Sequence, residues 1–339
     1  MSDKRIPEAR LGDGGPTTGA QGLGCMGMSE FYGPTDEGAA RETLEAALEG
    51  GVTMFDTADM YGLGANEEFL APFVKAHRDE VFLATKFGIE RDPENRQARG
   101  FRGDRDYVRR SIEGSLRRLG VDHVDLYYMH RRDEGTPLEE TVGAMAELVE
   151  EGKVRHIGLS EVTSAELREA HAVHPVTAVQ SEWSLFSRDI EEKVVPAAAE
   201  LGVALVPYSP LGRGFLTGQF TDAEKHLDES DFRRGHERFT GANAESNARL
   251  LEPVRAVAER HGVSPATVAL AWVHGRASVH GLSVVPIPGT RKASRLRENL
   301  AAMDLELSED DLAALEPIGA QVAGRRYPVG ARFSSQDRE

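Results

Sequence analysis

The chain has 339 residues, of which 40% are hydrophobic and 28% are charged, and its net charge is −16. This composition is ordinary for a soluble, folded enzyme with one large domain. The negative charge opposes contact with nucleic acid and with anionic membranes, so we expect neither as a partner. A single cysteine, Cys25, excludes an internal disulfide and favours a reducing, cytoplasmic location. No apolar run reaches the roughly 18 residues that a membrane span needs.

The start of the chain carries a glycine pattern that has two interpretations. Residues 1–20 are largely polar or rich in Gly, Pro and Thr, and we expect a mobile arm or a short hairpin there. Residues 22–27 then read Gly-Leu-Gly-Cys-Met-Gly, which matches the dinucleotide-binding pattern G-x-G-x-x-G. That pattern needs a strand before it and a helix after it, whereas the flanking residues here are typical of loops. A Rossmann fold is therefore a minor alternative to a short strand whose glycines permit close packing.

Short apolar runs alternate with helical patterns over most of the remaining chain. The runs predict eight strands, at residues 22–26, 52–56, 81–86, 124–129, 154–160, 176–182, 203–208 and 283–287. Helical spacing predicts helices at residues 36–49, 66–76, 106–119, 138–151, 164–173, 190–201, 250–261, 265–275 and 293–302. Such alternation indicates a parallel sheet with right-handed crossovers. Eight units favour the α/β class and a (β/α)8 TIM barrel, a parallel eight-stranded barrel with outer helices, formed by one domain over residues 1–339.

Three segments interrupt this alternation. Residues 90–105 are polar and contain Pro and Gly, so we expect a loop at the mouth of the barrel. Residues 211–247 are too long for an ordinary connection and predict either a functional lid or a disordered loop. Residues 317–339 have no strong pattern, so we expect a mobile tail whose end, 334–339, is frayed.

Polar residues that suit proton transfer follow the ends of three predicted strands. Asp56, Lys86 and His130 each end an apolar run, and Tyr61 comes five residues after Asp56. In a parallel barrel the carboxyl ends of all strands meet at one mouth, so these four side chains are expected to converge. Each has a plainer alternative role, as a loop cap, a core or rim aromatic, a surface charge or a solvated imidazole. Together they favour a catalytic interpretation.

These four residues are suited to supplying a proton to a reacting oxygen atom. A free tyrosine, with a pKa near 10, is a poor acid at neutral pH, and a neighbouring ammonium lowers that pKa. We expect Lys86 to do so for Tyr61, with Asp56 as the ionic partner of the buried ammonium. His130 can donate a hydrogen bond that orients the reacting oxygen.

The chain resembles the aldo-keto reductases over nearly all of its length. Residues 56–62, Asp-Thr-Ala-Asp-Met-Tyr-Gly, are similar to the aspartate–tyrosine motif of that family, and Lys86 and His130 match its other two catalytic positions. Four further segments match its cofactor contacts in the right order, namely 158–160, Gln180, 208–211 and 287–290. Residues 22–29 and 171–175 most resemble the branch that holds perakine reductase, pyridoxal reductase and the plant auxin-induced proteins.

The resemblance implies a reductase that uses NADPH to convert aldehydes or ketones to alcohols, with Tyr61 as the general acid. It implies that Ser160 and Gln180 bond the nicotinamide carboxamide, and that Tyr208 stacks on the nicotinamide ring. The other implied cofactor residues are Gly27, Met28, Ser209, Pro210, Leu211, Gly212, Arg213, Gly289, Thr290, Arg291, Arg295, Glu298 and Asn299.

Two departures from the family pattern bear on the cofactor. Many members carry asparagine where this chain has Glu161, which can still accept a hydrogen bond from the carboxamide but cannot donate one. Many carry lysine where this chain has Gly289. A preference for NADPH over NADH therefore depends on Arg291 and Arg295, which lie one helical turn apart at a predicted helix start.

Other interpretations remain open at this stage. A different class of protein on the same fold is a redox sensor that binds the cofactor, like the potassium-channel β-subunits. No HExxH or C-x-x-C motif is present, so no metal site is expected. An apolar substrate mouth is expected from Phe31, Tyr32, Met60 and Trp183, with Phe232 also considered, although core packing explains each of them nearly as well. The sequence identifies neither the small-molecule carbonyl substrate nor the oligomeric state.

Overall fold

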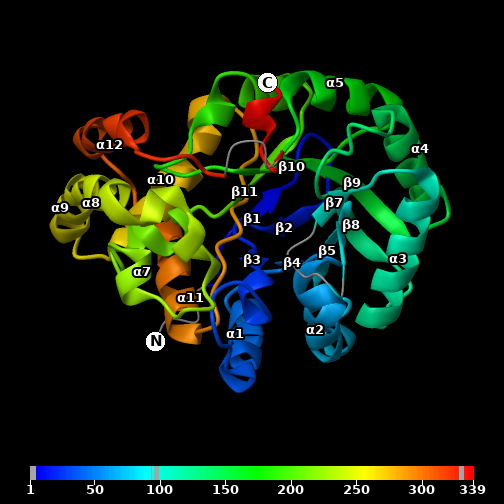
Figure 1. Cartoon of the computed structure of the whole chain (residues 1–339), viewed down its shortest axis with the longest axis horizontal. Coiled ribbons are helices and arrows are strands. Elements are labelled where there is room, and N and C mark those ends of the chain that lie inside the picture. Colours follow the sequence, from blue (N-terminus) through cyan, green and yellow to red (C-terminus); the bar gives the residue numbers. More distant parts are fainter. Residues whose placement is uncertain (1–4, 93, 95–98, 328–331) are drawn as a thin grey trace.

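The computed structural model describes residues 5–92, 94, 99–327 and 332–339. Its centre is a parallel sheet of seven strands in the order β11-β10-β9-β8-β5-β4-β3, curved into a barrel (Figure 1). The strands are β3 (Leu23–Gly24), β4 (Met54–Asp56), β5 (Phe82–Phe87), β8 (Val124–Met129), β9 (Val154–Ser160), β10 (Ala178–Glu182) and β11 (Ala204–Tyr208). Each lies within two residues of a predicted strand.

The predicted eighth strand, residues 283–287, closes the barrel without forming a regular ladder. On one side the Val285 N–H donates to the Leu205 carbonyl of β11 at 2.9 Å, and on the other the Gly22 N–H donates to the Pro286 carbonyl at 2.9 Å. Pro286 has no N–H to donate in return, so the pairing is interrupted. The fold is the (β/α)8 barrel that the sequence predicts, with a weak seam at its last strand.

A closed ring of helices surrounds the barrel. Contacts run in order around it through α1 (Glu37–Glu49), α2 (Ala65–Ala76), α3 (Arg105–Leu119), α4 (Leu138–Glu150), α5 (Ser164–Val173), α6 (Val194–Glu200), α10 (Pro265–His280), α11 (Ala293–Leu300) and back to α1. Among the described residues, four helices lie outside this ring, namely α7 (Ala223–His226), α8 (Gly241–Arg249), α9 (Leu251–His261) and α12 (Glu309–Leu315). Figure 1 shows α8, α9 and α12 together at one end of the molecule.

Local signals explain several helix ends, and two helices differ from prediction. The Asp36 side chain accepts from the Ala39 N–H and so begins α1 where the sequence predicts it. Helix α10 was predicted to end at Gly275, but it continues to Gly281, whose φ of 66° provides the left-handed cap. The helix predicted at 190–201 is split, because a short 3-10 turn precedes α6.

The strands alternate between two cores, as their period of two requires. In β8, Leu126 and Tyr128 belong to the cluster inside the barrel, whereas Tyr127 and Met129 belong to the larger cluster between strands and helices. All six residues of this strand are buried, since both faces are covered. This two-sided burial fixes the register of the strand and therefore the residue that follows it, His130.

Residues 8–19 form the hairpin that was one of the two expectations for the N-terminal arm. Strands β1 (Glu8–Arg10) and β2 (Thr17–Gly19) pair in antiparallel fashion. Leu11, at the end of β1, has no exposed surface and joins the cluster inside the barrel. The Asp13 N–H donates to the Gly202 carbonyl, just before β11, so the hairpin closes the amino end of the barrel. Residues 1–4 of the predicted arm lie outside the described residues.

The Rossmann interpretation of residues 22–27 is wrong, because the sheet closes into a barrel. The short strand β3 is followed by a 3-10 turn, Met26–Met28, and not by a helix whose N-terminus faces a phosphate. The glycines serve close packing instead. A Cβ on Gly22 would lie 2.8 Å from the Ile287 side chain, and one on Gly24 would lie 2.9 Å from the Ile287 carbonyl oxygen.

The segments beyond the strand ends are more ordered than the sequence indicates. Within the predicted mouth loop 90–105, β6 (Ile89–Arg91) pairs with β7 (Arg99–Phe101), and residues 93 and 95–98 lie outside the described residues. The long segment 211–247 contains α7, α8 and three 3-10 turns, packed through Phe215, Phe220 and Phe239. Across the described residues, no helix has the length and apolar character of a membrane span.

The end of the chain packs on the barrel, contrary to the fraying expected for residues 334–339. The Ser335 N–H donates to a carboxylate oxygen of Glu161 at 3.0 Å. The Glu339 side chain accepts from the Ser164 N–H at 2.9 Å, at the first turn of α5. The sequence could not indicate these partners, because both contacts join positions more than 170 residues apart. Residues 328–331 of this tail lie outside the described residues.

Candidate active site

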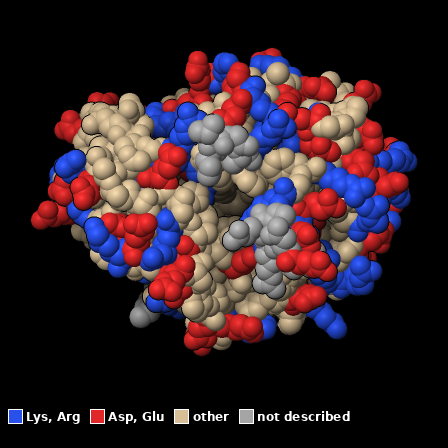
Figure 2. Space-filling view, viewed as in Figure 1, with Lys and Arg blue, Asp and Glu red and all other residues tan. Residues whose placement is uncertain are grey.

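A cavity of about 670 Å³ opens at the carboxyl ends of the barrel strands. Figure 2 shows the molecule hollowed near the middle of this view, with uncharged residues inside and charges of both signs around the rim. Of the four residues predicted to be catalytic, Asp56, Tyr61 and His130 line this cavity. Lys86 is fully buried behind them. The predicted convergence at one mouth is therefore present.

Lys86 joins these groups through three contacts. Its ammonium forms an ion pair with a carboxylate oxygen of Asp56, donates to the Thr57 carbonyl at 2.8 Å and lies 3.5 Å from the Tyr61 hydroxyl. Neighbouring strands β4 and β5 supply the pair, so the sheet itself sets their distance. Gln180 donates to the second oxygen of Asp56 at 2.8 Å, which completes the enclosure of the carboxylate.

The fourth residue predicted to be catalytic, His130, lies next to Tyr61 on the wall of the cavity. Their ring centroids are 5.8 Å apart and the rings are nearly perpendicular, at 84°. Burial, reinforced by the charges of Arg131 and Lys86, holds the pKa of His130 well below its usual value. The imidazole is therefore neutral at pH 7, and its Nδ1 has no hydrogen-bond partner among the described residues. A neutral imidazole of this kind can donate one hydrogen bond to a ligand oxygen.

Burial dominates the ionisation of the other three groups. It raises the pKa of Asp56 and lowers the pKa of Lys86, and in each case the partner's charge acts in the opposite direction. Burial also raises the pKa of Tyr61 well above its usual value, as does Asp56, while Arg131 acts to lower it. Lys86 was expected to lower this pKa, but the balance is upward. The phenol is therefore protonated throughout the neutral range.

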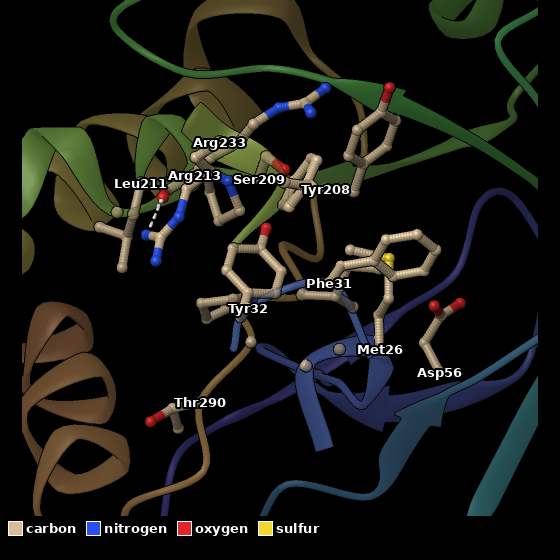
Figure 3. Close-up of a pocket in the computed structure, with 18 of the residues that line it drawn as sticks. Met26, Phe31, Tyr32, Asp56, Tyr208, Ser209, Leu211, Arg213, Arg233 and Thr290 are labelled. Atoms are coloured by element: carbon tan, nitrogen blue, oxygen red, sulfur yellow. Dashed lines mark hydrogen bonds between the residues drawn. The ribbon is translucent and has the colours of Figure 1, made fainter. Parts of the chain in front are cut away.

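Most residues predicted to hold the cofactor line the same cavity. They are Gly27, Ser160, Gln180, Tyr208, Ser209, Pro210, Leu211, Arg213, Gly289, Thr290, Arg291, Arg295, Glu298 and Asn299. Figure 3 shows Tyr208, Ser209, Leu211 and Arg213 on one side of the cavity and Thr290 below them. Met28 and Gly212 do not line it, since both are buried beneath its wall.

One end of the cavity is cationic and adjoins the start of α11. Arg291, Lys292 and Arg295 line it there, and no side chain caps the first turn of the helix. Free N–H groups at a helix start favour an anion. Arg291 differs from expectation, because it donates to the carbonyls of Tyr32 and Pro34 at 3.0 and 2.8 Å and so fastens the loop beside it. Lys292 was not predicted, although its position next to the helix start was a usable signal.

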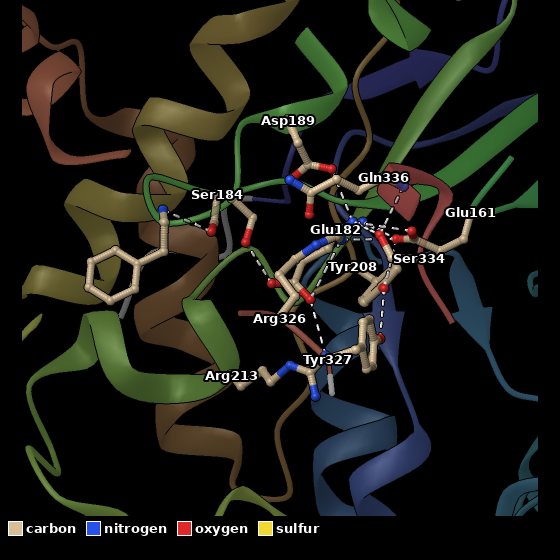
Figure 4. A network of polar contacts seen from close by, with 12 residues as sticks. Glu161, Glu182, Ser184, Asp189, Tyr208, Arg213, Arg326, Tyr327, Ser334 and Gln336 are labelled. Carbon is tan, nitrogen blue, oxygen red and sulfur yellow. Dashed lines mark hydrogen bonds and ion pairs between the residues drawn. The ribbon is translucent and has the colours of Figure 1, made fainter. Parts of the chain in front are cut away.

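Glu161 does not face the cavity, contrary to the expectation that it accepts from the carboxamide. Its backbone has φ of 50°, and its fully buried carboxylate accepts from Tyr208 at 2.8 Å and from Arg326 at 3.1 Å. Burial acts to raise its pKa, but the charges of Arg326 and Arg131 prevail and lower the pKa to about 2. Glu161 therefore anchors the C-terminal segment, as Figure 4 shows.

Arg326 is the centre of a network that the sequence did not reveal. Besides Glu161, it bonds Asp189 at 3.0 Å and the Ser334 hydroxyl (Figure 4). The adjacent Tyr327 places its hydroxyl 3.1 Å from that of Tyr208. The described part of the tail thus forms a wall of the cavity beside the ring that was predicted to stack on the nicotinamide. The only sequence signal was the unusual Glu161.

The predicted substrate residues divide into two groups. Phe31, Tyr32 and Met60 line the cavity, together with Phe232, which was also considered, and Phe333, which was not. Trp183 does not belong to the site. It is fully buried in the outer core, and its indole N–H donates to Glu191 at 2.9 Å. Core packing, the alternative that the sequence left open, is the role that this side chain has.

No cluster of His, Cys, Asp and Glu that could hold a metal ion occurs in the described part of the chain. The site instead combines a proton donor, a neutral imidazole and a cationic end within one cavity. This arrangement suits a reaction on a neutral group held beside an anionic cofactor.

Comparisons with known proteins agree with this arrangement. The family model described as "Aldo/keto reductase family" matches residues 21–320. The chain is 43% identical to the "Probable aldo-keto reductase 1" of Glycine max, covering 97% of this chain and 94% of that protein. Among solved structures it is similar to a glycerol dehydrogenase from Gluconobacter oxydans, with a TM-score of 0.81, 25% identity and coverage of 97% and 99% of the two chains.

A second similar structure is a thermostable aldo-keto reductase in complex with the inhibitor epalrestat. It has a TM-score of 0.71 and 30% identity, and the match covers 93% of this chain and 100% of that one. The family match extends over most of the barrel and includes every strand at whose end a predicted catalytic residue lies. The chain belongs to the aldo/keto reductase family.

Proposed function

We propose that this member of the family is an NADPH-dependent reductase of aldehydes or ketones, with Tyr61 as the general acid. The observation that carries the proposal is the Lys86–Asp56 ion pair, buried directly behind the Tyr61 hydroxyl at the cavity wall. A buried ammonium is costly to maintain, and its place 3.5 Å from a phenol gives it a chemical use. Membership of the aldo/keto reductase family supports the oxidoreductase class.

The nicotinamide, when bound, supplies the hydride. His130, neutral and facing Tyr61, donates a hydrogen bond to the carbonyl oxygen and directs it toward the phenol. Tyr61 gives its proton to the alkoxide as it develops, because an alkoxide is a much stronger base than a phenolate. Lys86 then stabilises the phenolate through the 3.5 Å contact, and Asp56 keeps the ammonium in place.

The residues present fit the proposed cofactor. Gln180 uses its amide nitrogen on Asp56, which leaves its amide oxygen to accept from the carboxamide. Ser160 lies beside it at the end of β9, and Tyr208 presents an aromatic ring at the same end of the cavity. The cavity volume falls within the range of about 300–1,000 Å³ that is usual for ligand sites.

The cationic end suits phosphates and supports NADPH over NADH. Lys292 and Arg295 stand at the uncapped start of α11, where a 2′-phosphate would gain both charge-assisted bonds and free N–H groups. Lys292 supplies a positive charge close to the position where many family members carry lysine and this chain has Gly289.

Two finer assignments belong to the same proposal. Residues 22–29 and 171–175 support a place in the branch with perakine reductase and pyridoxal reductase. The single cysteine, Cys25, is free and buried, which supports a cytoplasmic location. The redox-sensor alternative is less favoured, because it gives no use for a proton donor at the cavity wall.

The test is NADPH absorbance loss with a panel of aldehydes and ketones, in the wild type and in Tyr61→Phe. The variant should lose about 10²–10⁴ in kcat, because only the proton donor is removed. Its NADPH affinity, measured by fluorescence titration, should not change. Tyr107→Phe removes a phenol that does not line the cavity and should keep full activity. A wild type that binds NADPH but reduces no carbonyl would favour the sensor, and full turnover in Tyr61→Phe would refute the acid.

A further inference from the structure

Arg131, which follows His130, is a buried cation without an ion-pair partner in the described structure. Only 6% of it is exposed, and it lines the cavity beside Tyr61 and His130. Its Nη1 donates to the His130 carbonyl at 2.6 Å and to the Ser160 hydroxyl at 3.1 Å, both of which are uncharged acceptors. No carboxylate of a described residue lies within the 4.0 Å of an ion pair.

Two other arginines of the cavity wall differ in this respect. Arg213 pairs with Glu182 at 3.1 Å, and Arg233 pairs with Asp231 at 2.6 Å. A buried charge without a partner is costly, so chains normally supply one. The carboxylate whose charge acts most on Arg131 is that of Glu161. Glu161 is already bonded by Arg326 and Tyr208, and it faces away from the cavity.

The missing anion therefore enters through the cavity. The cofactor's phosphates, on the function proposed above, occupy the cationic end at α11. Arg131 lies at the opposite end, since it bonds Ser160, one of the two residues proposed to hold the carboxamide. A carboxamide is neutral and cannot neutralise a guanidinium. The anion at Arg131 then belongs to the substrate.

A second cation at this end, the exposed side chain of Arg99, also has no ion pair with a described residue. Arg99 lines the cavity, and its guanidinium lies 5.4 Å from the centre of the Phe31 ring. No carboxylate of a described residue pairs with it either. Around it stand the apolar side chains of Met60, Ile89 and Phe333. The substrate end of the cavity thus combines apolar walls with positive charge, although the whole chain has a net charge of −16.

We propose that the preferred substrates are aldehydes or ketones that carry a carboxylate, and that Arg131 binds this carboxylate while the carbonyl lies against Tyr61 and His130. The inference rests on the proposed function and names its substrate class. The carboxylate takes no part in the bond changes. Hydride from the reduced nicotinamide adds to the carbonyl carbon, the Tyr61 proton goes to the oxygen, and the carboxylate keeps its charge. A planar guanidinium suits a carboxylate because it can form two parallel hydrogen bonds.

The experiment compares carboxylic acids with their neutral esters, both built on the same benzaldehyde ring. We would measure kcat/KM for 2- and 4-carboxybenzaldehyde and for their methyl esters, in the wild type, Arg131→Gln and Arg132→Gln. The wild type should prefer at least one acid over its ester by about tenfold to a hundredfold, as expected for a charge-assisted contact. Arg131→Gln should lose this preference and still reduce the ester. Arg132→Gln should keep it, because Arg132 bonds the Thr136 carbonyl and does not line the cavity.

Further arms separate this inference from the function on which it rests. Equal rates for both acids and their esters in the wild type would overturn the inference and leave the proposed function intact. If no aldehyde is reduced, the proposed function fails. The affinity of the NADPH-bound protein for benzoate, compared with its affinity for the neutral benzamide, then decides whether the anion site exists. Should Arg131→Gln not fold, Arg131→Lys serves instead. It keeps the charge but not the paired bonds, and an unchanged acid-to-ester ratio in it would contradict the role of the guanidinium.

Discussion

Among the buried ion pairs at the carboxyl ends of the barrel strands in the described structure, two differ in what they hold in place. Lys86 and Asp56 come from the adjacent strands β5 and β4, so the sheet itself places them. Glu161 and Arg326 are 165 residues apart, and their pair holds the tail against the end of β9. The first pair is a consequence of the fold, whereas the second adds a segment to it.

The difference lies in what surrounds each pair. The ammonium of Lys86 has a partner, a backbone carbonyl and the Tyr61 hydroxyl, which faces the cavity. The Glu161 carboxylate is surrounded by donors, including Tyr208 and the Ser335 N–H, and Glu161 itself does not line the cavity. A pair with a reactive neighbour is expected to matter for turnover. A pair that is enclosed by structural donors is expected to matter for stability and for the shape of the cavity wall.

Breaking the first pair should have the largest effect on activity. In Lys86→Met the phenolate of Tyr61 loses its stabilising charge, and we expect kcat to fall by about 10²–10⁴. The Asp56 carboxylate is left buried without its cation, which should cost about 3–5 kcal/mol of unfolding free energy. NADPH oxidation and urea unfolding measure the two effects.

The control is Lys75→Met, which removes an exposed lysine from α2 and should change neither quantity. Asp56→Asn should reduce activity less than Lys86→Met, because the ammonium stays near Tyr61. Activity near that of the wild type in Lys86→Met would remove the distinction between the two pairs.

Breaking the pair of Glu161 and Arg326 should mainly lower the stability of the fold and, to a smaller extent, the affinity for the cofactor. In Arg326→Ala, Glu161 loses its ionic partner, while Glu182 keeps Arg213. We expect a loss of about 3–5 kcal/mol, together with faster hydrogen exchange at the Ser335 N–H, which depends on Glu161. NADPH affinity should fall several-fold, because Tyr208 loses its fixed neighbours, while kcat at saturation should change little.

Arg325→Ala is the matched control for that variant. Its side chain is exposed, and its hydrogen bond to Glu237 uses the backbone N–H, which alanine retains. An equal fall of stability in both variants would mean that the tail contributes through its general packing and not through the pair with Glu161.

The same contrast explains what the sequence could predict. Every strand near the first pair follows from local apolar runs, and the period of two fixes which residue reaches the mouth. Asp56, Lys86 and His130 were found by this reasoning. The seam at Pro286 could not be predicted as an interruption, since its cause is a pairing between distant segments.

Little in the sequence indicates the pair of Glu161 and Arg326. Arg326 lies in a polar tail without periodicity, and its partners Glu161 and Asp189 are more than 130 residues away. The left-handed backbone of Glu161 is a tertiary property that no local pattern encodes. Lys292 and Arg131 were overlooked for a different reason, because each stands next to a residue that already had a role.

The last prediction uses acid to separate the two pairs. The folded pKa of Glu161, about 2, is below its ordinary value of 4.5, so its ionised form stabilises the fold above pH 4.5. This contribution, about 3 kcal/mol by the size of the shift, is lost as the pH falls from about 4.5 toward 2. Asp56 has the opposite sign, because burial raises its pKa, so the folded state takes up its proton more readily. Acid should therefore weaken the attachment of the tail, whereas the protonation of Asp56 by itself does not lower the stability of the fold.

Urea unfolding between pH 6 and pH 3 measures this slope in the wild type and in Glu161→Gln. The glutamine still accepts from Arg326 and Tyr208 but has no charge to titrate, so the variant should be less stable at pH 6 and should lose less stability on acidification. The difference between the two proteins should shrink steadily below about pH 4.5, because the unfolded chain then takes up a proton that the folded Glu161 carboxylate, with its pKa of about 2, does not. Parallel slopes would mean that other carboxylates cause the acid sensitivity, and that Glu161 contributes to the tail as a neutral acceptor would.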